Sequence, residues 1–296
     1  MSKSEHMMLD IVKVALAEDV GPGDLTSLAC LEPGPVRAVI MAKSDGVLSG
    51  LKPALLTFDI VDSANIITPL KSDGDRFRTG DRIVDIDGFN QTVLTAERTA
   101  LNFLGHLSGI ATLTGQFVDC VRGTSCRILD TRKTVPGLRH LEKMAVEHGG
   151  GCNHRMGLYD MVLIKDNHIA SAGSIAAAVE RTRGFLDTAD FRLQFSATAD
   201  EIKIEVEVST EEQIEKAIAA GVDRLLIDNV GPEKLTSMVA LARGKSSKIE
   251  LEASGNVSLD TVADIAASGV DFVSIGALTH SAASSDFSLL VCEANG

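Results

Sequence analysis

From residue 127 onward, short apolar runs alternate with amphipathic segments, and this rhythm is the strongest constraint on the fold. The runs have the length of buried strands, and the segments between them have helical spacing, several with Pro or Thr at the start and Gly at the end. Residues 219–229 and 267–277 repeat one order: helix end, Gly-Val-Asp turn, buried strand. Such repeats predict a parallel sheet, open or closed into a barrel. The expected strands lie at residues 127–130, 160–165, 202–208, 224–228, 248–253 and 272–276.

The first third of the chain has a different pattern. Residues 36–93 contain short β-like runs separated by turn residues, which predict a small α+β unit. A long helix is expected over residues 95–121, with a possible break near Gly105 or Gly109. Residues 184–202 are long for a connection and could form an extra hairpin or a mobile insertion.

Composition excludes several classes of protein. The 296 residues carry a formal net charge of -13, which argues against nonspecific nucleic-acid binding. With no Trp and one Tyr, platforms for stacking bases are scarce. No uninterrupted apolar run approaches 18 residues, so no membrane helix is expected. Five cysteines without CxxC spacing indicate reduced thiols and a cytoplasmic location, and Cys152, next to the glycine run, is expected to pack and not to act as a nucleophile.

Cations gather in one part of this acidic chain. Residues 127–168 hold seven Lys or Arg and four of the seven histidines, against five acids. This stretch also contains the run Gly149-Gly150-Gly151, which could bring backbone close to an anion or could simply end a helix. An acidic protein that concentrates its cations in this way is expected to bind anionic ligands there.

Charged residues fall at the ends of the expected strands, where βα-barrels carry their chemistry. Lys165, Glu207 and Asp228 occupy these positions on three successive strands. Because side chains alternate along a strand, Lys203, Glu205 and Glu207 share one face, which should line the barrel interior. Glu205 and Glu250 could instead form a layer of salt bridges at the barrel bottom.

Two turns of small residues follow the last two strands. Ser254-Gly255-Asn256 precedes a helix, and Gly276 begins another turn. Adjacent turns of this kind are typical of the phosphate site of βα-barrels, although two ordinary turns would look the same.

Seven motifs follow one another along nearly the whole chain. They are EDVGPGDLTS at 18–27, AERTALNFLGHLSGIAT at 96–112, TRKTVPGLRHLEKMAVEHGGGCNHRMGLYDMVLIKDNH at 131–168, IEVEV at 204–208, LLIDNV at 225–230, LEASGNV at 251–257 and VSIGALTHSA at 273–282. Taken in order, these motifs resemble the quinolinate phosphoribosyltransferase family. The resemblance implies a small N-terminal α/β sandwich domain at residues 1–110 and an incomplete TIM-like α/β barrel of about six strands at residues 111–282, with the tail 283–296 returning to the first domain.

The resemblance also implies a reaction, in which quinolinate and phosphoribosyl pyrophosphate give nicotinate mononucleotide, pyrophosphate and CO₂. Arg132, His154 and Arg155 are expected to hold the quinolinate carboxylates, with Thr131 in the substrate site. The family works as a dimer, so Arg98 is expected to reach the neighbouring subunit's site.

The remaining roles concern the phosphorylated substrate. By resemblance, Lys133 and Lys165 contact phosphoribosyl pyrophosphate, while Glu207 and Asp228 bind the ribose hydroxyls and Mg²⁺. These four are the expected catalytic residues. The 5′-phosphate is expected at Ser254, Gly255, Asn256 and Gly276.

Three other functions fit parts of the pattern. One is a paralogous phosphoribosyltransferase of the same fold, ModD-like or nicotinate-using. A second is a Schiff-base lyase that uses Lys165, and a third is an anion-binding protein without catalysis. The insertion at residues 184–202 is longer than expected for the family, although it lies outside the matching motifs.

Overall fold

The computed structural model describes residues 3–292, which form two compact units. The first unit contains the chain up to Gly115, Lys133–Gly151 and the stretch from Ala277 onward; the second contains Gln116–Arg132 and Cys152–Gly276. The boundary predicted at residue 110 lies inside a continuous helix, and the first unit includes a segment from within the predicted barrel range. No helix in the described part of the chain is long and apolar enough to span a membrane.

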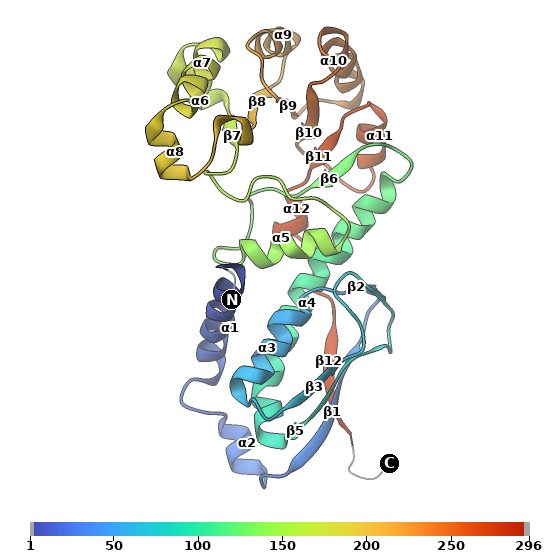
Figure 1. The fold of residues 1–296 in the computed structure, drawn as a ribbon. Coiled ribbons are helices and arrows are strands. Elements are labelled where there is room, and N and C mark those ends of the chain that lie inside the picture. The colour runs from blue at the N-terminus through green and yellow to red at the C-terminus, as the bar shows by residue number, and fades with distance from the viewer. Residues whose placement is uncertain (1–2, 293–296) are drawn as a thin grey trace. The chain divides into compact units, whose positions relative to one another are not determined.

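The first unit is a helix layer on an antiparallel sheet, as expected for an α/β sandwich (Figure 1). Its core joins buried residues of α3 and α4 to the sheet, including Phe58, Leu104 and Ile40. The sheet has the order β12 (Phe287–Cys292), β1 (Pro35–Ala42), β5 (Arg82–Phe89), β3 (Ile66–Pro69), and β2 (Gly46–Val47) pairs with β4 (Arg76–Phe77). The helices are α1 (Lys3–Val20), α2 (Leu25–Cys30), α3 (Leu51–Val61), α4 (Asn90–Cys120), α5 (Arg139–His148) and α12 (Ala277–His280).

Helix α4 is continuous, so the break considered near Gly105 or Gly109 is wrong. The two glycines serve close packing instead. A Cβ on Gly109 would lie 2.1 Å from the carbonyl oxygen of Ala283, and one on Gly105 would lie 2.9 Å from that of Ser285. The C-terminal chain therefore passes directly over α4 before β12 pairs with β1.

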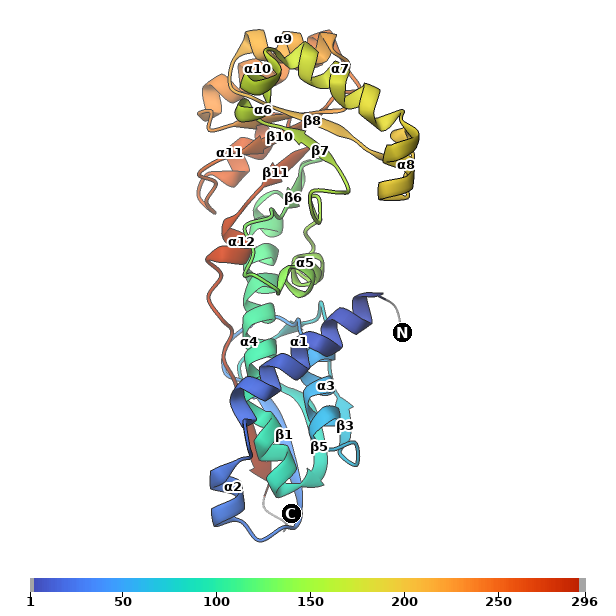
Figure 2. The same ribbon diagram turned by 90° about the vertical axis from the view of Figure 1, so that its left-hand side faces the viewer.

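The second unit is a six-stranded, all-parallel open sheet, which confirms the predicted strand number and fold class. The helices α7, α9, α10 and α11 lie outside the curved sheet (Figure 2). The strand order is β6 (Arg127–Leu129), β11 (Phe272–Ser274), β10 (Glu250–Ser254), β9 (Arg224–Asp228), β8 (Ile204–Val208), β7 (Val162–Ile164). The helices are α6 (Asp166–Ala172), α7 (Ile175–Leu186), α8 (Ala189–Phe195), α9 (Glu211–Ala219), α10 (Pro232–Lys245) and α11 (Val262–Ala267).

The long connection at residues 184–202 is helical, so the alternative of an extra hairpin is wrong. Thr188 accepts a hydrogen bond from the backbone N–H of Phe191 and thereby caps α8. The ring of Phe191 stacks on Phe195 at 5.2 Å and meets Phe185 edge-on at 5.7 Å. This small aromatic cluster supplies the apolar contact that an isolated seven-residue helix lacks.

Candidate functional site

One face of the second unit's sheet carries its charged residues, as the alternation along β8 predicts. In the strand register, Arg224 lies between Glu205 and Glu250, and Leu226 lies between Glu207 and Glu252. The opposite face is apolar and packs on the helices. Two regions of the polar face differ: a buried end formed by Glu205, Arg224, Glu250 and Glu252, and a carboxyl edge formed by Lys165, Glu207 and Asp228.

The buried end is held together by Arg224, a residue that the sequence did not single out. Its guanidinium contacts Glu250 at 2.8 Å and Glu252 at 3.1 Å, and it lies 4.2 Å from the ring centre of Phe272. Lys203 contacts the other oxygen of Glu250 at 2.7 Å. Glu250 therefore belongs to a salt-bridge layer, which was one of the two alternatives considered for it.

His154 also contacts the buried end. Cys152, two residues before His154, is held beside β6 because its backbone N–H donates a hydrogen bond to the carbonyl of Ile128. The imidazole Nε2 lies 3.1 Å from Glu205 and 3.5 Å from Glu252, while Nδ1 accepts the backbone N–H of Arg155 at 2.7 Å. Because Nδ1 is an acceptor, the ring proton lies on Nε2 and points at the carboxylates.

The two buried glutamates have unusual titration. Burial, above all, raises the pKa of Glu205 to about 7 and that of Glu252 to about 7. His154, Glu205 and Glu252 offer ligand atoms within 4.8 Å of one another, the only such group of His, Cys and acids within residues 3–292. However, Nε2 presents a proton and Arg224 already supplies positive charge, so this arrangement is a hydrogen-bonded network and not a metal site.

The carboxyl edge is more open. Lys165, at the start of α6, forms an ion pair with Glu207, and its side chain is 48% exposed. Asp228 ends β9 and accepts a hydrogen bond from the side chain of Asn229 at 2.7 Å. The sequence prediction that these three side chains end neighbouring strands is correct in position. Polar side chains that are partly exposed at a sheet edge can meet a ligand at a lower desolvation cost than fully buried ones.

The turns after β10 and β11 continue this edge. Ser254 is in register with both Asp228 and Ser274, so the two strands end at the same level. Gly255 has φ of +100°, and a Cβ there would lie 2.1 Å from the side-chain oxygen of Asn229. Only glycine fits this position. Asn256 follows with φ of +49°, and Gly276 lies two residues after the end of β11, so turns of small residues follow two adjacent strands.

Two arginines lie close together in the second unit. Burial, and next the neighbouring charge of Arg132, lower the pKa of Arg155. One guanidinium nitrogen of Arg155 donates to the carbonyl of Met161 at 3.1 Å. Arg132 and Thr131 follow β6 directly. A pair of guanidinium groups in a half-buried place is suited to bidentate binding of carboxylates.

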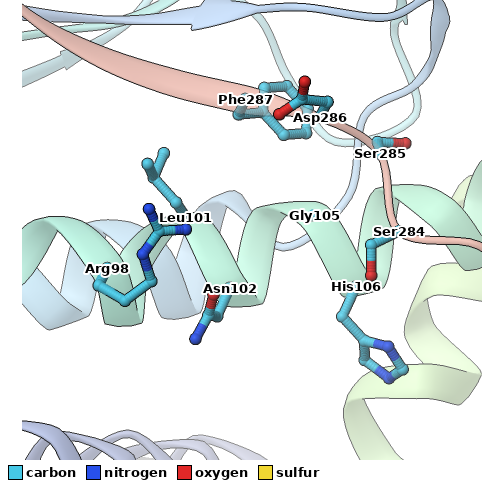
Figure 3. A pocket seen from close by; sticks show the side chains of 9 residues that line it. All are labelled: Arg98, Leu101, Asn102, Gly105, His106, Ser284, Ser285, Asp286 and Phe287. Carbon is cyan, nitrogen blue, oxygen red and sulfur yellow. The ribbon is translucent and has the colours of Figure 1, made fainter.

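The other predicted residues, Lys133 and Arg98, belong to the first unit. The carbonyl of Lys133 accepts a hydrogen bond from Thr279 at 2.8 Å. Arg98 is exposed on α4, where it lines a pocket of about 310 Å³ with Asn102 and His106 from the same helix (Figure 3). The backbone and side chains of residues 284–287 form the opposite wall of this pocket.

The glycine run ends a helix. Helix α5 stops at His148, and Gly150 has φ of +86°. A Cβ on Gly149 would lie 2.4 Å from the carbonyl oxygen of Ala111, and one on Gly151 would lie 2.8 Å from the methyl group of Thr114. The run therefore lets α5 end against α4, which favours the structural alternative over contact with an anion.

Comparisons with known proteins agree with this arrangement. The sequence model of the quinolinate phosphoribosyl transferase N-terminal domain matches residues 24–108, and that of the C-terminal domain matches residues 110–290. The probable nicotinate-nucleotide pyrophosphorylase (carboxylating) of Bacillus subtilis is 41% identical over 94% of this chain and 91% of its own length. The enzyme of that name from Mycobacterium leprae is 40% identical, over 92% of this chain and 93% of its own. The nicotinate-nucleotide pyrophosphorylase structure from Francisella tularensis superposes with a TM-score of 0.90 at 37% identity, over 99% of this chain and 98% of that one. The chain belongs to the quinolinate phosphoribosyl transferase family.

Proposed function

We propose that this protein transfers the phosphoribosyl group of phosphoribosyl pyrophosphate to quinolinate and releases pyrophosphate and CO₂, giving nicotinate mononucleotide. The main supporting observation is the carboxyl edge. Lys165, Glu207 and Asp228 end three neighbouring strands, and the turn after Ser254 continues the same edge. A cation, two acids and a turn of small residues in one row match a substrate with a diphosphate, ribose hydroxyls and a phosphate.

Quinolinate would be bound by the arginine pair. Arg132 and Arg155 provide planar donors for its two carboxylates, with Thr131 beside them. The Nε2–H of His154 now donates to Glu205, and a substrate carboxylate could accept it in place of Glu205. In this proposal the half-buried surroundings of Arg155 strengthen its attraction for the anion.

Mg²⁺ would be held with the pyrophosphate by Glu207 and Asp228. Both offer carboxylate oxygens, the hard donors that Mg²⁺ prefers, and Mg²⁺ is commonly bound by one or two carboxylates plus substrate phosphates. The ion would add positive charge to the leaving group. Lys165 and Lys133 would add further charge to the same pyrophosphate, and the acids would also bind the ribose hydroxyls.

The chemical steps follow from these positions. The quinolinate nitrogen forms a bond to the first carbon of ribose while the bond from that carbon to the pyrophosphate oxygen breaks. Positive charge develops on the ribose, where Glu207 and Asp228 stabilise it. The ring nitrogen is then cationic and stabilises the carbanion that is left on the adjacent carbon when CO₂ departs, and that carbon takes a proton from water. Positioning therefore contributes more than acid–base catalysis.

The 5′-phosphate would lie on the two adjacent turns. Backbone N–H groups of Gly255, Asn256 and Gly276 would donate to it, together with the hydroxyl of Ser254. The backbone at Gly255, with its positive φ and its close contact to Asn229, supports this assignment because a turn that only glycine can form has one fixed conformation.

The dimer is part of the proposal. Arg98 is exposed and lines the α4 pocket, so it is available to complete the site of a second subunit. Arg98→Ala and Lys165→Ala subunits should each be inactive alone. When mixed in equal amounts and allowed to exchange, half of the dimers are mixed and each has one intact site, so about a quarter of the activity should return. Proven exchange without recovery would reject the shared site.

The five free cysteines support a cytoplasmic location.

The deciding experiment is an assay with quinolinate, phosphoribosyl pyrophosphate and Mg²⁺, following nicotinate mononucleotide and CO₂ together. Nicotinate in place of quinolinate is the control, since a nicotinate-using paralogue would form product without CO₂. The lyase alternative is weakened because Lys165 is half-exposed and paired with Glu207, whereas Schiff-base lysines are desolvated or lie beside other cations. Product from nicotinate alone, or no product from either, would reject the proposed function.

A further inference from the structure

We propose that Glu142 is a positioning residue, which fixes the loop that carries Lys133 to helix α4. The role of Lys133 rests on the proposed function, whereas the contacts of Glu142 do not. Glu142 lies on α5 and its side chain is fully buried. It is one of the few completely buried acids of the molecule, and the proposed reaction does not use it.

Both oxygens of this carboxylate are engaged by groups from two different segments. Oε1 accepts a hydrogen bond from Nε2 of His106 on α4 at 2.8 Å. Oε2 accepts the backbone N–H of Val135 at 3.1 Å. A buried carboxyl oxygen without a hydrogen bond is costly, and each oxygen of Glu142 has one. Glu142 therefore joins the loop to α4 through one contact on each oxygen.

The loop between Lys133 and α5 is stiff enough to transmit this anchor. Residues 135–138 form a turn in which the N–H of Leu138 donates to the carbonyl of Val135 at 3.1 Å. Pro136 fixes one central position, and Gly137 adopts φ of +85° at the other, the pattern of a type II turn. Thr279 holds the carbonyl of Lys133 on the other side. The backbone of Lys133 is thus fixed from both directions.

The other end of the anchor is the wall of the α4 pocket. His106 lies eight residues after Arg98 on α4, and both side chains line this pocket (Figure 3). The imidazole of His106 also contacts Glu142. Glu142 therefore sets the position of Lys133 relative to the stretch of α4 that carries Arg98 and His106.

A side chain without hydrogen-bonding groups cannot replace this carboxyl. Glutamine is unsuitable as a test, because its oxygen can accept from Val135 while its NH₂ group donates to Nε2 of His106 in the other tautomer. Glu142→Met removes both acceptors at nearly the same size and should release the loop. Glu147→Met is the matched control because Glu147 is exposed on the same helix and undergoes the same substitution.

The first test is a double-mutant cycle on the binding of phosphoribosyl pyrophosphate, measured by calorimetry. Glu142→Met should weaken binding roughly tenfold, a loss of about 1.4 kcal/mol, and Glu147→Met should not change it. In a Lys133→Ala background, Glu142→Met should cause no further loss, because its effect acts through Lys133. An equal loss in both backgrounds would show a merely structural role and overturn the proposal.

The second test does not require activity. Hydrogen exchange at the Val135 amide should be at least roughly tenfold faster in Glu142→Met than in wild type or Glu147→Met at the same global stability. Unchanged protection of Val135 would overturn the anchor itself. If wild type binds no phosphoribosyl pyrophosphate but Val135 responds as expected, the proposed function fails while the anchor of the loop stands.

Discussion

The two ends of the polar face use the same residue types for different purposes. At the buried end, Arg224 is shared by Glu250 and Glu252; the side chains of Arg224 and Glu252 are 9% and 0% exposed, and that of Glu250 is 29% exposed. At the carboxyl edge, Lys165 and Glu207 form one ion pair, with 48% and 17% of their side chains exposed. The pair of Arg224 with Glu252 is cut off from water and organises the fold, whereas Lys165 is exposed enough to exchange its partner for a ligand.

The largest expected effect is on activity at the carboxyl edge. Lys165→Ala removes a charge from the proposed pyrophosphate site, so turnover should fall roughly a thousandfold or more, equivalent to about 4 kcal/mol. Stability should change by less than about 1 kcal/mol because the pair with Glu207 is partly exposed. Steady-state kinetics and denaturant unfolding measure both. Lys216→Ala removes a similar ion pair on α9 and should affect neither. A loss of activity below tenfold would contradict the assignment.

Next is the stability of the buried end. Arg224→Ala leaves buried carboxylates without their cation and a gap beside Phe272, which should cost about 3–5 kcal/mol in unfolding free energy. Arg243→Ala is a suitable control because its ion pair with Asp271 is about one-third exposed. If Arg224→Ala folds as stably as this control, the two ends are not different in the way described.

The buried end also predicts a pH dependence of stability. The pKa of Glu252 is raised from 4.5 to about 7, so the folded protein binds more protons than the unfolded chain between these values. The contribution of the Glu252 carboxyl to stability should therefore be fully present below about pH 4.5 and should be lost as pH rises through 7. Glu252→Gln removes the titration and should be more stable than wild type at pH 8 by roughly 1–3 kcal/mol.

Glu250→Gln is the control, because the pKa of Glu250 is shifted in the opposite direction to that of Glu252. Despite partial burial, hydrogen bonds from Lys203 and Arg224 lower the pKa of Glu250. Its contribution to stability is present above its unfolded pKa and is lost as pH falls. Glu250→Gln should therefore destabilise the protein at pH 8. Unfolding by denaturant across pH 5–8 would separate the two variants, and changes of the same sign in both would contradict the opposite pKa shifts of Glu250 and Glu252.

Sequence reasoning predicted the polar face but not its division. Alternation places Glu205 and Glu207 on one side of β8 whatever their neighbours are. Which of them is buried depends on strand register, because Arg224 is in line with Glu205 and not with Glu207. The contact of His154 with Glu205 joins residues 51 positions apart, which no local pattern reveals. The helical insertion was missed although its signals are local, namely the cap at Thr188 and the spacing of Phe191 and Phe195.

The smallest expected effect concerns the ring at the buried end. Phe272 lies under two guanidinium groups, those of Arg224 at 4.2 Å and Arg127 at 4.6 Å from its centre. Phe272→Leu keeps an apolar side chain but removes the π face, so stability should fall by about 1 kcal/mol while turnover stays within about twofold of wild type. In an Arg224→Met background the loss should be smaller, since one cation is already absent. An unchanged loss there, measured by denaturant unfolding, would mean that Phe272 contributes only volume and that the carboxylates alone hold Arg224 in place.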